Sequence, residues 1–157
     1  MESTSTIRYG SYIYGKWAAN AVEANNGIKV ASTQGAFAAI RTDGSVTCWG
    51  YDSYGANFDS VMSSLTTAVT DIYSTLYAFA ALKENGQVIT WGLDVYGGDS
   101  SSVVGMLGDS IKTLSSTAGA FAALTKTGSV VTWGYDQVST TLFFFLSGKS
   151  LSLIRLY

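Results

Sequence analysis

Apolar and polar positions alternate along this chain in one pattern that occurs three times. In each copy an Ala-rich apolar segment leads into a Gly-containing turn, and an alternating segment then ends in Trp-Gly. The apolar segments begin at Ala36, Ala78 and Ala120, so the spacing is 78 − 36 = 42 and again 120 − 78 = 42 residues. A constant period of about 20 to 50 residues is the signature of a repeat architecture. We therefore expect one structural unit to recur along the chain.

Each unit is expected to form three short antiparallel strands. Alternation in the third segment places Thr47 and Trp49 on one face of a strand, and Val46 and Cys48 on the other. The expected strands cover 28–33, 36–41 and 46–50, then 69–75, 78–83 and 88–92, then 111–117, 120–125 and 130–134. The chain is thus predicted to be mainly β, in three-stranded antiparallel units.

A Gly-containing turn joins the second and third strands of every unit. Asp43-Gly44 and Asn85-Gly86 are residue pairs preferred in type I′ hairpins, where both central residues need φ > 0. Thr127-Gly128 stands at the same place in the third unit. The pattern predicts a tight hairpin at each site.

A short helical turn is expected between units, at 61–65 and at 103–107. Each segment carries two apolar residues four positions apart, which share one edge of a helix. The candidate capping residues are Asp59 or Ser60 for the first turn and Ser101 or Ser102 for the second.

The large aromatic side chains of the repeat are expected to fill the core in equivalent environments. They are Phe37, Phe79 and Phe121 in the second strands and Trp49, Trp91 and Trp133 in the third. An aromatic residue at the same strand position in every copy favours core packing over stacking on bases or sugars.

A longer motif links the third strand to the loop after it. Residues 43–55 and 85–97 both follow (Asp/Asn)-Gly-x-Val-x-x-Trp-Gly-x-Asp-x-Tyr-Gly. This motif resembles the RCC1-type β-propeller repeat, in a short-blade form of about 42 residues, and the resemblance extends over 28–136. It implies propeller blades in an incomplete propeller or an open stack, because a closed ring needs about four to eight blades. It also implies a platform that binds proteins.

The repeat divides a single domain, 1–157, into segments. They are a degenerate partial repeat (1–27), two repeats (28–69 and 70–111), a partial repeat (112–137) and a non-repeat apolar tail (138–157). About three blade equivalents result. Three arrangements would complete them: further repeats in a longer gene product, association of several copies, or terminal segments that cap an open stack.

Composition narrows the possible chemistry. The 157 residues are 47% hydrophobic, enough for a packed core, and include no His, the commonest general base and metal ligand. The net charge of −2 lacks the clustered Lys and Arg of a nucleic-acid-binding surface. Cys48 stands where the other copies have Thr and is interpreted as a small packed residue. We expect no enzyme activity, catalytic residue, cofactor, metal or nucleic-acid partner.

No targeting segment is evident in the sequence. No stretch approaches the about 20 apolar residues of a membrane-spanning helix. Residues 1–6 lack the charged start and apolar core of a secretory signal. We expect no membrane span, and the compartment stays open, with a cytoplasmic or nuclear location as the default.

Loops rich in tyrosine and aspartate are the candidate partner-contact sites, because tyrosine is enriched at protein-binding surfaces. The candidate residues are Tyr51, Asp52, Tyr54, Asp94, Tyr96, Tyr135 and Asp136. A second interpretation of the three aspartates is turn stabilisation by their side chains. A metal at 94–99 is disfavoured, because the segment lacks the ligand spacing of a calcium loop.

These observations favour a non-catalytic protein–protein interaction module built from RCC1-like repeats. The alternative is a structural subunit of a larger assembly or homopolymer, with repeats packed end to end. The expected partner is another protein or a second copy of this chain. The apolar, uncharged segment Leu142–Leu146 is a candidate contact, or a strand that closes or caps the stack. The alternative is foreign sequence from a misread exon boundary, because the repeat register is lost after Asp136.

Overall fold

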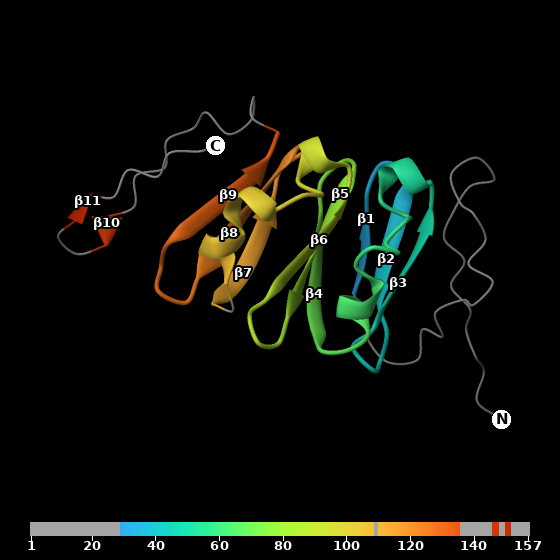
Figure 1. The fold of residues 1–157 in the computed structure, drawn as a ribbon, viewed down its shortest axis with the longest axis horizontal. Helices are drawn as coiled ribbons and strands as arrows, with labels where there is room; N and C mark the ends of the chain where they lie inside the picture. The colour runs from blue at the N-terminus through green and yellow to red at the C-terminus, as the bar shows by residue number, and fades with distance from the viewer. Residues whose placement is uncertain (1–28, 109, 136–145, 148–149, 152–157) are drawn as a thin grey trace.

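A computed structural model describes residues 29–108, 110–135, 146–147 and 150–151. It shows a mainly β protein whose described residues form three three-stranded antiparallel sheets side by side in chain order (Figure 1). The sheets comprise β1 (Val30–Ser32), β2 (Ala36–Ile40) and β3 (Val46–Gly50); β4 (Val69–Ser74), β5 (Ala78–Lys83) and β6 (Val88–Gly92); and β7 (Ile111–Ser116), β8 (Ala120–Thr125) and β9 (Val130–Gly134). Strands β10 (Leu146–Ser147) and β11 (Ser150–Leu151) pair separately. The predicted fold class is confirmed.

The strand register is the same in all three sheets. Phe37 pairs with Trp49, Phe79 with Trp91, and Phe121 with Trp133. In each pair the two rings stack, with centroids 5.5, 5.3 and 5.4 Å apart. Cross-strand aromatic pairs of this kind stabilise a sheet beyond the area that they bury.

The two faces of each sheet differ in the size of their side chains. In the second sheet, Phe79 and Trp91 point toward the first sheet, and Ala78 and Ala80 point toward the third. The small alanines let the next sheet approach closely, and the rings of that sheet fill the space between the two. The core is therefore divided into two layers, one at each interface between sheets.

The prediction of equivalent environments for the aromatic residues is confirmed for the second and third sheets only. Phe79, Trp91, Phe121 and Trp133 are buried, whereas Phe37 and Trp49 are half-buried. The difference arises because these two rings lie on the face of the first sheet that points away from the other two.

The segments between sheets contain the expected helical turns, η2 (Met62–Leu65) in the first and η4 (Ser101–Val103) with α1 (Val104–Leu107) in the second. Two further 3₁₀ turns that the sequence analysis did not predict, η1 (Asp52–Tyr54) and η3 (Asp94–Tyr96), occupy the loops after the third strands. Leu65, Val103 and Leu107 point from them into the core.

The predicted caps of these helices are wrong. The residues at the cap positions of η2, η4 and α1 are Val61, Ser100 and Val103, and none makes a side-chain cap bond. Asp99 instead accepts a hydrogen bond from the Ser101 amide at 2.8 Å. An Asx turn at Asp99 therefore precedes the helix, at an earlier position than the predicted caps.

The hairpins occur where the sequence predicts them, but the type I′ geometry is wrong. Gly44 has φ 75°, whereas Asp43 does not have positive φ. The Gly44 amide donates to the Arg41 carbonyl, and the Arg41 amide donates to the Ser45 carbonyl, which describes a longer turn with a glycine bulge. Asp43 contributes through its side chain, which accepts from the Ser45 amide at 2.9 Å.

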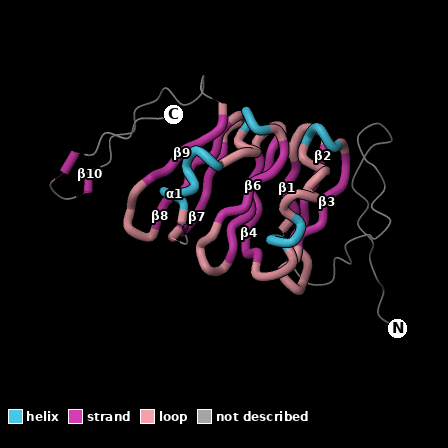
Figure 2. The backbone as a smooth tube through the Cα atoms, viewed as in Figure 1, coloured by secondary structure: helices cyan, strands magenta, loops and turns pink. Residues whose placement is uncertain are grey.

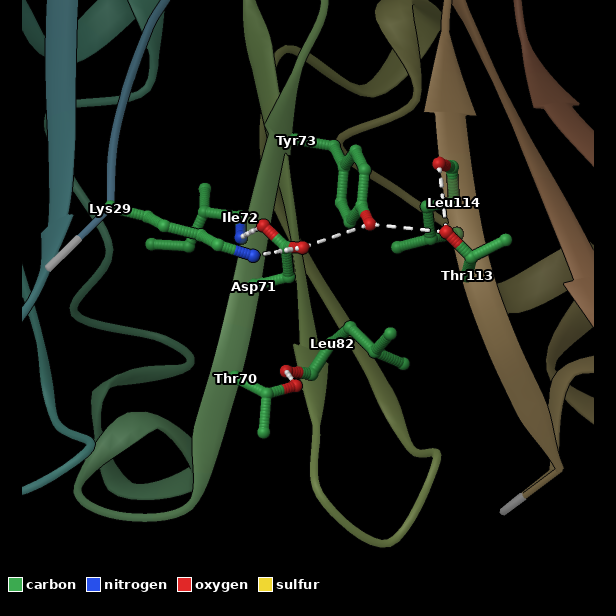
Figure 3. A network of polar contacts seen from close by, with 8 residues as sticks. All are labelled: Lys29, Thr70, Asp71, Ile72, Tyr73, Leu82, Thr113 and Leu114. Atoms are coloured by element: carbon green, nitrogen blue, oxygen red, sulfur yellow. Dashed lines mark hydrogen bonds and ion pairs between the residues drawn. The ribbon is translucent and has the colours of Figure 1, made fainter.

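The turns between the first and second strands of successive sheets are joined by bonds between residues one period apart. The Gln34 amide donates to the Leu76 carbonyl, and the Leu76 amide donates to the Ala118 carbonyl, both at 2.9 Å. A polar network runs in the same direction (Figure 3): Lys29 pairs with Asp71, which accepts from the Tyr73 hydroxyl at 3.1 Å. Polar contacts thus connect adjacent sheets along one side of the stack, and aromatic rings fill the space between the faces of adjacent sheets.

Replacement of Trp91 by Ala is expected to lower the free energy of unfolding by about 3–5 kcal/mol, because a fully packed ring is lost. Urea denaturation followed by circular dichroism measures this loss. Trp49→Ala is the matched control and is expected to cost clearly less, because Trp49 is half-buried. Equal losses for the two variants would contradict the packing described here.

Candidate functional site

The loop after the third strand has the same backbone in the first two repeats. In the first loop the Tyr54 amide donates to the Tyr51 carbonyl at 3.0 Å, and the Gly55 amide donates to the Asp52 carbonyl at 3.1 Å. Gly55 adopts φ 99°, a region that favours glycine. The turns η1 and η3 built in this way lie along one edge of the stack, opposite the hairpins (Figure 2).

Each of these loops is held by the following repeat. The Trp91 indole N–H donates to the Gly55 carbonyl at 3.0 Å, and the Trp133 indole donates to the Gly97 carbonyl at 3.1 Å. A Cβ atom on Gly55 would lie 2.8 Å from the Phe79 ring. The Tyr-Gly motif therefore reflects close packing against the next sheet.

A threonine of the same repeat holds the loop from the other side. The Thr33 hydroxyl donates to the Tyr54 carbonyl at 2.8 Å, and the Thr75 hydroxyl donates to the Tyr96 carbonyl at 3.0 Å. With the backbone fixed on both sides, the tyrosine side chains have a defined place at the edge of the stack.

The tyrosines of these loops form a continuous row across the three repeats. Ring centroids are 6.1 Å apart between Tyr51 and Tyr54, and 5.1 Å apart between Tyr54 and Tyr77. The row continues from Tyr77 to Tyr96 at 4.5 Å and from Tyr96 to Tyr135 at 5.5 Å. We call these five residues the tyrosine edge.

Tyr77 is the member of this row that the sequence analysis missed. It stands where the first and third repeats have Gly35 and Gly119. A Cβ atom on Gly35 would lie 2.9 Å from the Tyr54 ring, so the glycine leaves room for that ring. At the next position along the row, Tyr77 instead contributes a ring that joins Tyr54 to Tyr96. Its departure from the repeat is the signal that could have identified it.

The sequence-predicted site residues fall into three groups. Tyr51, Tyr54, Tyr96 and Tyr135 are brought together in the row, and Asp136 lies outside the described residues. Asp52 and Asp94 lie in its loops and are exposed. Within the described residues their carboxylates accept no hydrogen bond, and backbone bonds close both turns.

Charge is distributed unevenly between the two ends of the sheets. The described basic residues all lie at the hairpin end: Lys29, Arg41, Lys83, Lys112 and Lys126. The tyrosine edge carries the Asp52 and Asp94 carboxylates and exposed apolar side chains, among them Leu93 and Val95. This edge is therefore aromatic, apolar and acidic.

Reactive groups are few in the part of the chain that the structure describes. There, no cluster of three or more His, Cys, Asp or Glu side chains could hold a metal. Burial raises the pKa of the Cys48 thiol to about 12, so the thiol is protonated at neutral pH and is a poor nucleophile. No helix in the described ranges has the length and apolar character needed to cross a membrane.

Comparison with known proteins finds solved structures of similar fold. No protein-family model matches the chain, and no curated protein matches it. The crystal structure of human WBSCR16 is similar, with a TM-score of 0.49 and 19% sequence identity. The match covers 71% of this chain and 35% of that one, so this chain spans about a third of the length of that protein. Fold and site together define a β-repeat protein with an aromatic edge.

Replacement of Gly97 by Ala is expected to destabilise the protein by about 1–3 kcal/mol or more, because it strains the backbone at a φ of 94°. The added Cβ atom would also lie 2.6 Å from the Phe121 ring. The comparison variant is Gly105→Ala in helix α1, where no atom lies within 4 Å of the added group. This change is expected to stabilise by about 0.5–1 kcal/mol. Thermal unfolding measures the stability of both variants. A melting temperature of Gly97→Ala equal to that of the wild type would contradict the packing of this loop against the following sheet.

Proposed function

We propose that this chain is a non-catalytic protein–protein interaction module built from RCC1-like repeats, with the tyrosine edge as its contact surface. The observation that carries the proposal is the unbroken row of rings from Tyr54 to Tyr135. Tyrosine side chains supply large, rigid contact area at low entropic cost, and they are enriched at protein interfaces.

Three further features support this proposal. Hydrogen bonds from Trp91 and Trp133 hold the loops that carry Tyr54 and Tyr96. These loops therefore lose little conformational entropy on binding. The hydroxyls of Tyr54, Tyr77, Tyr96 and Tyr135 make no hydrogen bond within the described residues. Exposed Leu93 and Val95 add apolar area beside them.

The test uses peptides selected for binding to the 157-residue chain from a random display library. Their affinity is then measured for the variant Leu93→Lys/Val95→Lys, which places two charges at positions that are 42% and 56% exposed. Binding is expected to weaken about tenfold or more, because the changed residues lie in the contact area.

The matched control is Val104→Lys/Met106→Lys, which adds the same charge at positions of α1 that are 65% and 52% exposed. Its affinity for the selected peptides is expected to be unchanged, and both variants should keep the wild-type melting temperature. Peptides that bind the two variants equally well would exclude the tyrosine edge as the contact surface.

A structural subunit that packs end to end is the second candidate. It is favoured by the two outer faces of the stack, which differ from the inner interfaces. Trp49 is half-buried, whereas Trp91 is buried. The Thr132 hydroxyl is buried without a hydrogen-bond partner, whereas its counterpart Thr90 bonds Ser100 at 3.0 Å. A second copy would supply an adjoining sheet to each outer face.

Sedimentation equilibrium at several concentrations tests this second candidate. End-to-end packing predicts an average mass that rises with concentration. Val130→Lys on the outer face of the third sheet should reduce the mass to that of a monomer, because a buried unpaired charge opposes association. Val104→Lys serves as the control. A monomer at all concentrations would exclude assembly through the outer faces.

A further inference from the structure

We propose that the tyrosine edge takes an extended peptide segment rich in Arg and Lys. This inference rests on the proposed function and names the chemistry of the partner. It depends on the positions of the charged side chains among the described residues. It also depends on the two carboxylates at the edge that make no hydrogen bond or ion pair there.

The separation of charge comes from the strand order itself. Each second strand runs from the tyrosine edge to the hairpin, and the basic residues cluster where it ends, as at Arg41 and Lys83. Lys112 and Lys126 lie at the same end of the third sheet. No Lys or Arg among the described residues lies at the tyrosine edge. The hairpin end combines these cations with acidic residues such as Asp43 and Glu84, whereas the tyrosine edge carries Asp52 and Asp94. A cationic segment would therefore be attracted to this edge with no described cation beside it to oppose the attraction.

The groups at the edge match the needs of such a segment. Asp52 and Asp94 project from equivalent loops of adjacent repeats, and their carboxylates have no partner within the described residues. They can accept charge-assisted hydrogen bonds from guanidinium or ammonium groups. Between them lie the rings of Tyr54, Tyr77 and Tyr96, whose negative potential also favours cations.

Other acidic residues of the described chain do not offer the same chemistry. Asp71 is paired with Lys29 and also bonded to Tyr73 (Figure 3). Asp99 is bonded to the amide and hydroxyl of Ser101. The carboxylates of Asp59 and Glu84 also accept no hydrogen bond within the described residues, but neither residue belongs to the loops that carry Tyr54 and Tyr96. Asp52 and Asp94 are thus the carboxylates of these loops with open acceptor positions.

The experiment measures fluorescence polarisation of labelled peptides of about ten residues, long enough in extended form to cross the three repeats. The probe alternates Arg and Ser, and the comparison peptides alternate Gln and Ser or Glu and Ser. The Arg peptide is expected to bind at least about tenfold more tightly than either, and to weaken as NaCl rises from about 50 to about 500 mM.

Variants then locate the site. Asp52→Asn/Asp94→Asn is expected to weaken binding of the Arg peptide about fivefold to tenfold. The control Asp43→Asn/Glu84→Gln changes the net charge equally at the hairpin end. It keeps the turn, because Asn85 already serves as the acceptor at the position equivalent to Asp43. This control is expected to leave the affinity within about twofold.

Each contrary result overturns a defined statement. Equal binding of the Arg and Gln peptides would overturn the cationic partner while the interaction module stands. Equal weakening by both double variants would show a general charge effect and would overturn the assignment to this edge. Binding of maltoheptaose or cellohexaose that Leu93→Lys/Val95→Lys abolishes would identify a carbohydrate surface and overturn both proposals. Failure of the Arg peptide, with library-selected peptides still bound at the edge, would overturn this inference alone.

Discussion

The hydrogen bond from a tryptophan indole to the glycine carbonyl of the preceding repeat is the constraint on which this structure depends. It occurs twice among the described residues, from Trp91 to Gly55 and from Trp133 to Gly97. In each case the indole is buried, so its N–H needs a partner, and the carbonyl of a tight loop provides it. The bond fixes the distance between repeats and holds the loop at the edge of the stack. Sheet packing and loop position are therefore set by one contact.

This constraint also explains why the aromatic edge is ordered. A loop whose backbone is bonded to the next sheet carries its tyrosine to a defined place, where rings from other positions, Tyr77 and Tyr135, lie beside it. The stacked rings of Tyr96 and Tyr135, with centroids 5.5 Å apart and planes 8° apart, come from different repeats. The same side chains also contribute to the core: Tyr54 and Tyr96 pack against the buried clusters on the two sides of the second sheet.

The outer faces of the stack are subject to the same packing requirement as the inner interfaces. An inner interface pairs an alanine face with a Phe–Trp face, and each face is complete only when its complement is present. At the first sheet Phe37 and Trp49 are half-buried, and at the third sheet the Thr132 hydroxyl is buried without a partner. Repeat proteins meet this requirement with terminal repeats of different composition or with further copies. The two candidate functions thus use different surfaces and are compatible in one molecule.

The sequence by itself determined the period, the three strands of each repeat and the alternation of their faces, because these depend on residues close together in the chain. It also indicated that Tyr54 and Tyr96 occupy equivalent loops, since both recur in the motif. Tyr77 departs from the glycine of the other repeats, but the sequence does not show that its ring contacts rings of two different loops. Nor could it predict that Asp43 closes its turn through its side chain, because Asp-Gly is compatible with several turn types. Only the tertiary structure decided which tyrosines meet and which carboxylates stay unpaired, since both depend on how one repeat packs on the next.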